Sequence, residues 1–528
     1  MNGAASIAKC GLARWMTAVF VCVTAARSLE WSHAKLLSQD EMYQFQTDSV
    51  GSLAELIHVQ RTWPISLDPL LDHVLSHGAM QVFGAGAFAQ RLPALAGFLL
   101  MQVCLFFLVR NLAGERAGAV AAAFPALTAT LYYAAEGRPY GLMLGLYALA
   151  AWCWQVAGRQ LSVVSSQLSE KAEGRKWALV GLAAAIAATI NAHYFGILVL
   201  APLCAAEGWR TLARRRIDWA VCGAIAAGAL GLLGTVPFLR AAGEFRANYY
   251  NAGTVGLHDL TRAYRSMFVD YTHMSVAAQH VWMAALVVFA AGLVWGCWRV
   301  RHSGEVRVAE SEWVLLLVLA AMPFVAYVVA RLVTHSIEVR FALGAMVAIS
   351  AMVGLAMAPW LRRDAVFNTA LVVLGLGIAG GGVVRIHAEQ QKTAARMASL
   401  ALPAEVKAAL AASADGRLYV QDMGVFEEDR YYEPDVDVRT RMTLVYSSTE
   451  ELRWNRHHTM ALTAMHMQQF TGLPVVSYEE LSGQPGEHVF VLYHSGWDWT
   501  DEAFAQDGAI VRPVGKAMGG DVAAVRFR

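Results

Sequence analysis

The sequence predicts a polytopic α-helical membrane protein with about 11 transmembrane helices, followed by a small C-terminal α/β domain outside the membrane. Of its 528 residues, 57% are hydrophobic and only 16% are charged, whereas an ordinary soluble domain has about 25% charged residues. Apolar stretches long enough to cross a bilayer follow one another between charged segments. The last part of the chain instead alternates short β-rich runs with a helical run, which is typical of an α/β domain.

Eight apolar stretches are expected to be single spans. They cover residues 92–109, 117–135, 139–158, 219–239, 276–298, 313–330, 341–361 and 365–384. A further stretch, 177–206, is too long for one helix. Basic residues precede it at Arg175 and Lys176 and follow it from Arg214 to Arg216. Because basic loops stay in the cytoplasm, both ends should lie inside, and the stretch should be a two-span hairpin that turns near residues 191–193.

The first apolar stretch, residues 15–26, allows two interpretations. It lies between Arg14 and Arg27 and could be a signal-peptide core, cleaved near Val23-Thr24-Ala25. It could also be a short first span whose arginines reach the interface. A signal peptide is unnecessary before so many spans, so the span is favoured.

This count gives an alternating topology with a cytoplasmic N-terminus. Short basic loops then fall on the inner side, as the positive-inside rule requires; they contain Arg110 with Arg116, residues 159–176, 210–216 and 299–307, and Arg362 with Arg363. The outer side receives residues 28–91, residues 240–275 and everything after Arg385. We therefore expect a transmembrane domain at 1–385, a linker helix at 386–410 and an outer α/β domain at 411–528. No cysteine follows Cys297, so the outer domain should have no internal disulfide.

Ionisable side chains gather at the outer membrane boundary. Asp40 and Glu41 lie side by side after the first span, and a tight connection before Pro139 contains Glu136 and Arg138 among tyrosines. Residues 69–83 read as a helix on the outer membrane surface. Ionisable groups at membrane depth are costly and commonly mark a functional site.

In their order, these motifs resemble a known group of enzymes. The matching segments are Asp40-Glu41, Pro69-Leu70, His77, Phe83-Gly84, Arg91-Leu92-Pro93, Glu136-Gly137-Arg138-Pro139-Tyr140 and, farther on, Glu338-Val339-Arg340-Phe341. The pattern is similar to the bacterial relatives of protein O-mannosyltransferases and to lipid A aminoarabinose transferases, which are GT-C glycosyltransferases. The match is specific over residues 37–145, loose to about 385 and absent in the tail. Two departures are Leu67-Asp68-Pro69-Leu70-Leu71, where relatives often have Pro-Pro-Leu-Tyr-Tyr, and Phe341, where a tyrosine is usual.

The resemblance implies a sugar donor on a polyprenyl-phosphate carrier and one inverting displacement. Asp40 would be the general base, which takes the proton of the acceptor hydroxyl, and Glu41 would orient it, position the acceptor or help to bind a cation. Arg138 and Arg340 would hold the departing phosphate. Further donor-site residues would be Glu136, Tyr140, His77 and His193. No cofactor is certain, and a divalent cation shared by Asp40 and Glu136 stays open.

Each residue also has a purely structural interpretation. The two acids could cap a solvated helix, Glu136 and Arg138 could be a structural ion pair, and Arg340 could be an interfacial anchor. His73 and His77 have the spacing of one helix face, which allows a metal site but supplies only two ligands. In the tail, Trp497 and Trp499 could stack on sugar or form core, and the segment from Arg453 to His458 could be a binding face or a solvated surface.

The sequence-based hypothesis is therefore a glycosyltransferase of the bacterial inner membrane that faces the periplasm. Its acceptor would be a periplasmic glycan, lipid or protein. Two alternatives belong to other classes: a transporter or flippase of lipid-linked glycans, and a non-catalytic envelope assembly protein. A transporter should have mid-span charges and symmetric broken helices, whereas the charges here lie at span boundaries. The net charge of +1 gives no support to a nucleic-acid partner.

Overall fold

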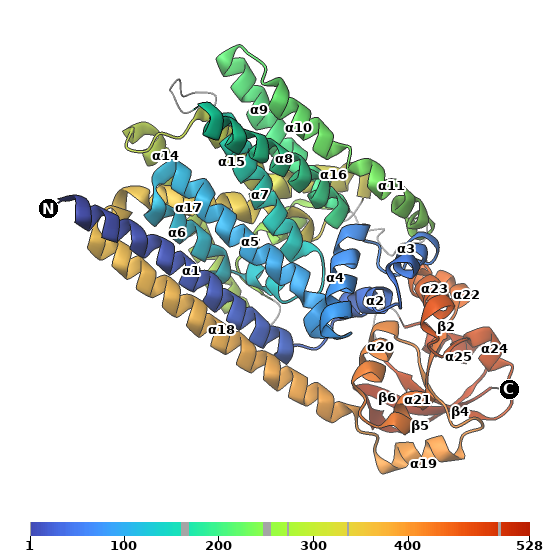
Figure 1. Ribbon diagram of the computed structural model, residues 1–528. Helices are drawn as coiled ribbons and strands as arrows, with labels where there is room; N and C mark the ends of the chain where they lie inside the picture. The colour runs from blue at the N-terminus through green and yellow to red at the C-terminus, as the bar shows by residue number, and fades with distance from the viewer. Residues whose placement is uncertain are drawn as a thin grey trace.

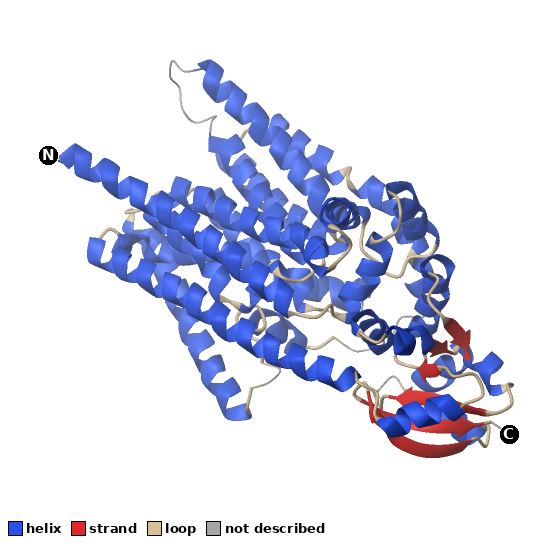
Figure 2. Cartoon of the chain, turned by 60° about the horizontal axis from the view of Figure 1, so that its bottom comes forward, coloured by secondary structure: helices blue, strands red, loops and turns tan. Residues whose placement is uncertain are grey.

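The computed structural model describes residues 2–159, 168–246, 255–271, 274–334, 337–494 and 498–527. A large bundle of helices occupies most of the molecule, and all strands gather in a small domain at one end (Figure 2). The N-terminus lies at the opposite end of the bundle (Figure 1). The chain is thus a polytopic helical membrane protein with a small C-terminal α/β domain, as the sequence predicts.

Within the described ranges, eight helices are long and apolar enough to cross a membrane, or nine with one bent pair. The eight are α1 (from Gly11 in Asn2–Ala34), α5 (Ala87–Ala113), α7 (Tyr140–Arg159), α9 (Leu200–Arg214) with the preceding 3-10 turn η4 (Tyr194–Val199), α10 with α11 (Trp219–Ala229, Leu232–Ala241), α14 (Val276–Ser303), α17 (Gly344–Leu361) and α18 (Asp364–Leu400). The bent pair is α15 (Glu310–Ala320) with α16 (Met322–Val329), which meet at 52°. Pro323 lies at this bend and lacks the amide hydrogen that a continuous helix needs.

Two other expected spans are present in a different form. The first half of the predicted hairpin is α8 (Leu168–Ala192), and the chain breaks at His193 as expected. The stretch at 117–135, by contrast, is not one helix. It consists of α6 (Glu115–Ala123) and two 3-10 segments, η1 (Phe124–Leu127) and η2 (Ala129–Ala134). Pro125 lacks the amide hydrogen that a continuing α-helix would need, and the Thr128 hydroxyl accepts a hydrogen bond from the Thr130 amide at 3.3 Å, which starts the second segment.

The N-terminal helix α1 is an integral part of the bundle. It runs beside α18 (Figure 1), and its side chains Phe20 and Thr24 are buried. The amide of Gln102 on α5 donates to the Thr24 hydroxyl at 3.3 Å. The segment around Thr24 therefore packs as the span interpretation expects.

Three short helices precede α5 and cover the end of the bundle nearest the α/β domain (Figure 1). They are α2 (Gln39–Asp48), α3 (Leu53–Thr62) and α4 (Leu70–Phe83). The Glu41 carboxylate accepts a hydrogen bond from the Ser38 amide at 2.9 Å, which satisfies a donor at the start of α2. Helix α4 begins directly after Pro69 and corresponds to the helix that the sequence predicts for residues 69–83. Two more short helices, α12 (Gly243–Arg246) and α13 (Leu257–Arg265), and two turns, η5 (Ala330–Thr334) and η6 (Val339–Ala342), complete the membrane part.

The last span and the first part of the expected linker form one continuous helix. Helix α18 continues without a break from Asp364 to Leu400, and α19 (Ala404–Ala412) follows it. A six-stranded sheet then forms in the order β3-β2-β1-β4-β6-β5, with β3, β2, β1 and β4 parallel. Its strands are β1 (Leu418–Val420), β2 (Met442–Tyr446), β3 (Val475–Ser477), β4 (Glu487–Leu492), β5 (Ile510–Ala517) and β6 (Gly520–Arg526). The β-rich runs of the sequence, at residues 417–420, 474–476, 489–493 and 522–525, correspond to β1, β3, β4 and β6, whereas β2 and β5 were not predicted.

Helices pack on both faces of this sheet. They are α20 (Met423–Tyr432), α21 (Val436–Arg441), α22 (Ser448–Glu450) with the turn η7 (Glu451–Asn455), α23 (Thr459–Thr471), α24 (Tyr478–Ser482) and α25 (Thr500–Gln506). Helix α20 packs against α2 of the membrane domain. The Leu37 amide donates to the Tyr432 hydroxyl at 2.9 Å, and Gly424 lets α20 approach Gln39 so closely that a Cβ would lie 2.6 Å from its Cδ. The α/β domain is thus fixed beside Asp40.

Candidate active site

Asp40 and two arginines line one cavity between the helix bundle and the α/β domain. The cavity has a volume of about 270 Å³. Arg340, from η6, donates through Nη1 to Asp40 Oδ2 at 2.6 Å, and Arg138, before α7, donates to the Asp40 backbone oxygen at 3.2 Å. The fold therefore brings together three of the predicted site residues, which lie as far as 300 positions apart in the chain.

The charges in this cavity keep Asp40 ionised. Burial alone would raise the pKa of Asp40, but the guanidinium groups of Arg138 and Arg340 outweigh burial and hold that pKa below its usual range. Two guanidinium groups thus lie beside one carboxylate in the cavity wall, while the Asp68 carboxylate pairs with Arg138 from outside that wall. Their N–H groups could bind a phosphate, because the planar fork of arginine matches phosphate oxygens well.

Arg138 is held in place by a residue that the sequence argument missed. Its Nη2 lies 2.6 Å from Asp68 Oδ2, and its Nη1 donates to the Ser66 hydroxyl at 3.0 Å. Asp68 also lies 3.5 Å from His193 Nε2, so it connects two predicted site residues. The sequence did contain a signal for the role of Asp68, because this residue lies in the Leu67–Leu71 segment, which departs from the motif of the relatives.

Aromatic rings form the wall behind the two arginines. The ring of Tyr140 lies 5.6 Å from the Arg340 guanidinium and 6.0 Å from that of Arg138. Phe341 stacks on Phe195 with ring centroids 4.1 Å apart. His193 contacts both Tyr140 and Phe341, and burial lowers the pKa of His193 to about 4. His193 is therefore neutral at physiological pH, and its Nδ1 accepts from the Phe195 amide.

Glu41 lies in the protein interior rather than in the cavity wall. Its side chain is fully buried, and it accepts hydrogen bonds from Arg91 Nε at 2.8 Å, from Lys35 Nζ at 2.9 Å and from the Gly137 amide at 2.7 Å. Burial would raise the pKa of Glu41, but Arg91 and Lys35 hold it far below its usual range. Glu41 thus ties α2 to α5 and to the connection that carries Arg138.

Glu136 is also buried, beside the cavity residues but not in their wall. Its Oε2 has no hydrogen-bond partner in the described part of the chain. Burial raises the pKa of Glu136 to about 7, although Lys35, Arg138 and Arg340 partly oppose this. Near neutral pH, Glu136 can therefore hold or release a proton close to the two arginines.

His77, on α4, contacts the last residue of α2 and is not among the residues that line the cavity. It bonds through Nδ1 to the Asp48 backbone oxygen at 2.9 Å. His73, one turn earlier on α4, bonds through Nδ1 to the Asp48 carboxylate at 2.5 Å and through Nε2 to Gln60. Both imidazoles are thus engaged by Asp48 and help to join α2, α3 and α4.

A second, larger cavity of about 700 Å³ lies among α1, η2, α14 and α18. Trp31, Tyr132, Trp282 and basic residues that include Lys35 and Arg385 line it. Lys35 also pairs with Glu41. The network that supports α2 therefore extends to this second cavity.

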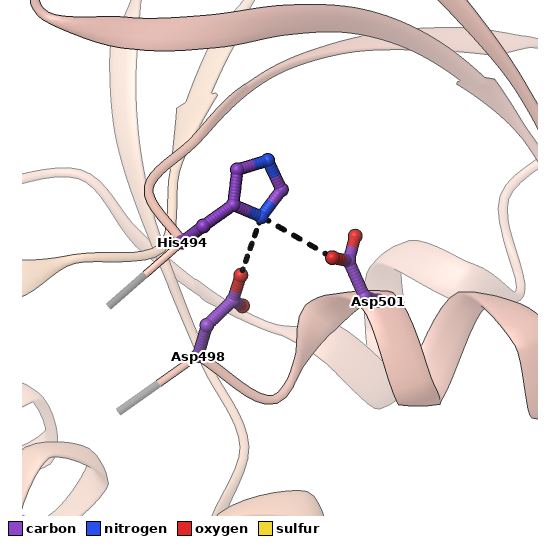
Figure 3. Close-up of side chains that lie close together, drawn as sticks. All are labelled: His494, Asp498 and Asp501. Carbon is purple, nitrogen blue, oxygen red and sulfur yellow. Dashed lines mark ion pairs between the residues drawn. The ribbon is translucent and has the colours of Figure 1, made fainter. Parts of the chain in front are cut away.

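The expectations for the tail have mixed outcomes. Trp499 is buried core next to Tyr478, whereas Trp497 lies outside the described residues. His494 lies within 3.3–3.7 Å of the carboxylates of Asp498 and Asp501 (Figure 3). Among the described residues, this is the one group of three side chains whose geometry suits a metal ion. It is exposed and does not include Asp40 or Glu136.

No protein-family model and no curated protein sequence matches the chain. Solved structures do match it. ArnT from Cupriavidus metallidurans in the apo state has a TM-score of 0.61 and 14% sequence identity, over 98% of this chain and 98% of that chain. The same protein bound to undecaprenyl phosphate has a TM-score of 0.60 and 14% identity, over 96% of this chain and 97% of that chain. The Archaeoglobus fulgidus oligosaccharyltransferase matches more weakly, with a TM-score of 0.46, 12% identity and coverage of 81% and 64%. The chain therefore has the fold of ArnT, a GT-C glycosyltransferase, along nearly its whole length, as the resemblance predicts.

Proposed function

We propose that this protein is an inner-membrane glycosyltransferase that moves a sugar from a polyprenyl-phosphate carrier to a periplasmic acceptor. One observation carries the proposal: Asp40, Arg138 and Arg340 share a cavity at the end of a bundle with the ArnT fold. ArnT has been solved in complex with undecaprenyl phosphate. Two arginines are well suited to bind the phosphate of such a carrier.

The basic residues at the other end of the bundle support the proposed orientation. Arg116 bonds to the Leu361 carbonyl, and Arg159 bonds to the Asn111 carbonyl. Basic connections remain in the cytoplasm, which supports a cytoplasmic N-terminus and a periplasmic cavity. All three outer segments that the sequence predicts contribute residues to that cavity: Asp40, Phe245 and Asp422.

The proposed reaction is a single displacement with inversion. The acceptor hydroxyl oxygen attacks the anomeric carbon, and the bond from that carbon to the phosphate oxygen breaks. Asp40 takes the hydroxyl proton, which it later returns to solvent, and the polyprenyl phosphate leaves as an anion held by Arg138 and Arg340. The arginines act on the departing charge, so their contribution is greatest in the transition state.

The remaining predicted site residues have supporting roles in this proposal. Tyr140 and His193 shape the wall behind the arginines, and Glu136 adjusts the local charge by binding a proton. Glu41 and His77 position the segments that carry Asp40. Transfer in excess EDTA would test whether a divalent cation, shared by Asp40 and Glu136, takes part.

The experiment measures release of free undecaprenyl phosphate in reconstituted vesicles. Membrane extracts supply mixed polyprenyl-phosphate sugars and acceptors, and the parent is compared with Asp40→Asn and Arg138→Ala. Asp437→Asn is the matched control, because it makes the same chemical change at an exposed carboxylate. We expect the parent and Asp437→Asn to release the carrier and Asp40→Asn to be at least about 100-fold slower.

Two results would contradict the proposal. Full activity of a folded Asp40→Asn would remove the assigned base. No release by the parent from any extract would favour a transporter or an assembly protein. Folding of each variant is checked by its melting temperature, so that loss of activity is not confused with loss of structure.

A further inference from the structure

The α/β domain forms half of the cavity that contains Asp40. Its contribution comes from the segments after β1 and after β2, namely Gln421, Asp422, Met423, Glu451, Thr459, Met460 and Thr463. In open α/β sheets, ligands bind outside the carboxyl ends of the strands, where the strand order reverses. Here the order reverses between β1 and β4, and the cavity lies next to this point, over the carboxyl ends of β1 and β2. The carboxyl ends of two parallel strands therefore face the proposed catalytic base.

The two halves of the cavity have different charge. The membrane half supplies Arg138 and Arg340, whereas the ionisable groups from the α/β half are the carboxyl groups of Asp422 and Glu451. Once a donor phosphate occupies the arginines, no other basic side chain remains to receive a second anion among the lining residues that the structure describes. A phosphorylated acceptor would then lie against Asp40 and Asp422, which is unfavourable between like charges.

The polar groups of the α/β half suit hydroxyl groups. Glu451 is only 3% exposed, and its Oε2 accepts a hydrogen bond from the Ala461 amide at 3.1 Å. Burial raises the pKa of Glu451 to about 8, so its carboxyl group carries a proton at neutral pH. Such a group can donate a hydrogen bond as well as accept one. Asp422 accepts from the Val425 amide at 3.0 Å, which fixes its side chain at the start of α20.

Apolar groups complete the lining. Ile65, Phe245, Met423 and Met460 lie among the polar residues. Apolar surface with a few fixed polar groups is the usual composition of a small-molecule site, and a sugar ring presents apolar C–H faces together with hydroxyl groups.

We infer that the acceptor is an uncharged carbohydrate, bound by its hydroxyl groups between α2 and the strand ends of the α/β domain, and that Asp422 and Glu451 determine its affinity. This inference rests on the proposed function and narrows its acceptor from a glycan, lipid or protein to a neutral glycan or the neutral sugar headgroup of a lipid. Asp422 and Glu451 are specificity residues in it, whereas Asp40 remains the base.

The test separates the acceptor pool by charge. Delipidated envelope extract and lipid extract are each passed over an anion exchanger, and unbound and bound fractions are added to vesicles that contain the full-length protein and polyprenyl-phosphate sugars. We expect the unbound fraction to support release of undecaprenyl phosphate. Periodate, which cleaves vicinal diols, should abolish that support, whereas proteinase K and dephosphorylation should not.

Two variants connect the acceptor to the residues. Asp422→Asn removes the carboxylate but keeps the helix cap, because asparagine caps as well as aspartate, and Glu451→Leu removes the carboxyl group that would donate to the acceptor. Each should raise the half-saturating acceptor concentration about 3- to 10-fold, as expected for one hydrogen bond, and leave that of the donor unchanged. Asp437→Asn should change neither value.

The outcomes are distinguishable. Release supported only by the bound fraction, or lost after proteinase K, would overturn the inference and leave the glycosyltransferase intact. Unchanged acceptor dependence in both folded variants would also overturn it. Absence of release with every fraction would overturn the proposed function, and the acceptor inference with it.

Discussion

Arg340 donates a hydrogen bond to Asp40 at 2.6 Å and thereby holds the proposed base in an ion pair when no donor is bound. An ion-paired carboxylate is a weak base, since the guanidinium stabilises its charged form. A donor phosphate would compete for the same guanidinium, so donor binding should raise the pKa of Asp40. The substrate would then strengthen the base that acts on it.

This relationship predicts two different acid limbs in the pH profile. Protonation of Asp40 should stop transfer, and kcat/KM for the donor reports the free enzyme whereas kcat reports the complex. The acid limb of kcat should therefore lie at higher pH than that of kcat/KM. In Arg340→Gln the limb of kcat/KM should move upward, because an arginine that lowers the pKa of Asp40 is removed. Identical limbs in the parent and in this variant would contradict the idea; Arg512→Gln, at an exposed arginine that also pairs with a carboxylate, is the control.

Arg138 should be sensitive even to a change that keeps its charge. Its guanidinium contacts Asp68, Ser66 and the Asp40 carbonyl at once, which a lysine ammonium cannot reproduce. We expect Arg138→Lys to lower kcat/KM for the donor about 10- to 100-fold. Asp68→Asn should have a smaller effect of the same kind, measured as a higher donor KM. A lysine variant with parental kinetics would show that charge alone is sufficient.

Asp72 should make stability depend on pH. Its Oδ2 accepts from Gln44 at 2.6 Å, and burial raises the pKa of Asp72 to about 7 from an ordinary value of 3.8. Because the folded pKa is the higher one, the contribution of Asp72 to stability is complete below about pH 4 and is lost as the pH rises through 7. At pH 8, Asp72→Asn should increase the free energy of unfolding by roughly 1–3 kcal/mol, with little change at pH 4. Thermal unfolding at both values checks this, and Asp437→Asn should show no such difference.

Docking of the α/β domain should depend on Gly424 and Tyr432. A larger side chain at residue 424 would push against Gln39, next to Asp40, and Tyr432→Phe would leave the Leu37 amide without its acceptor. We expect Gly424→Val to increase proteolysis near residues 401–403 and to reduce transfer. Tyr432→Phe should cost about 1–3 kcal/mol of docking free energy. Unchanged proteolysis in both variants would show that other contacts hold the domain.

Hydropathy and the positions of basic residues predicted most of the membrane part. These signals are local, because a bilayer imposes a length and a charge distribution on each span. The break after α6 could also have been predicted, since Pro125 lies inside the apolar stretch. The continuity of α18 could not have been predicted, because its apolar sequence ends near residue 384 while the helix continues to Leu400.

The missed features depend on long-range contacts. Strand β5 contains Pro513 and Gly515 and has a bulge between them, so its sequence lacks the usual strand pattern. The partnership of Asp68 with Arg138 joins segments 70 positions apart. Neighbouring helical side chains also diverge, which is why Asp40 reaches the cavity while Glu41 turns into the interior.

The unbroken helix α18 couples the distance between bilayer and α/β domain to the rotation of that domain. Each residue in a helix adds about 1.5 Å of length and about 100° of rotation. A one-residue insertion after residue 385 would therefore turn the strand ends away from Asp40, although it would hardly change their height. A seven-residue deletion would nearly restore the direction but lower the domain by about 10 Å. In the evolution of this architecture, sequence length between the last span and the sheet should thus change in whole helical turns or not at all.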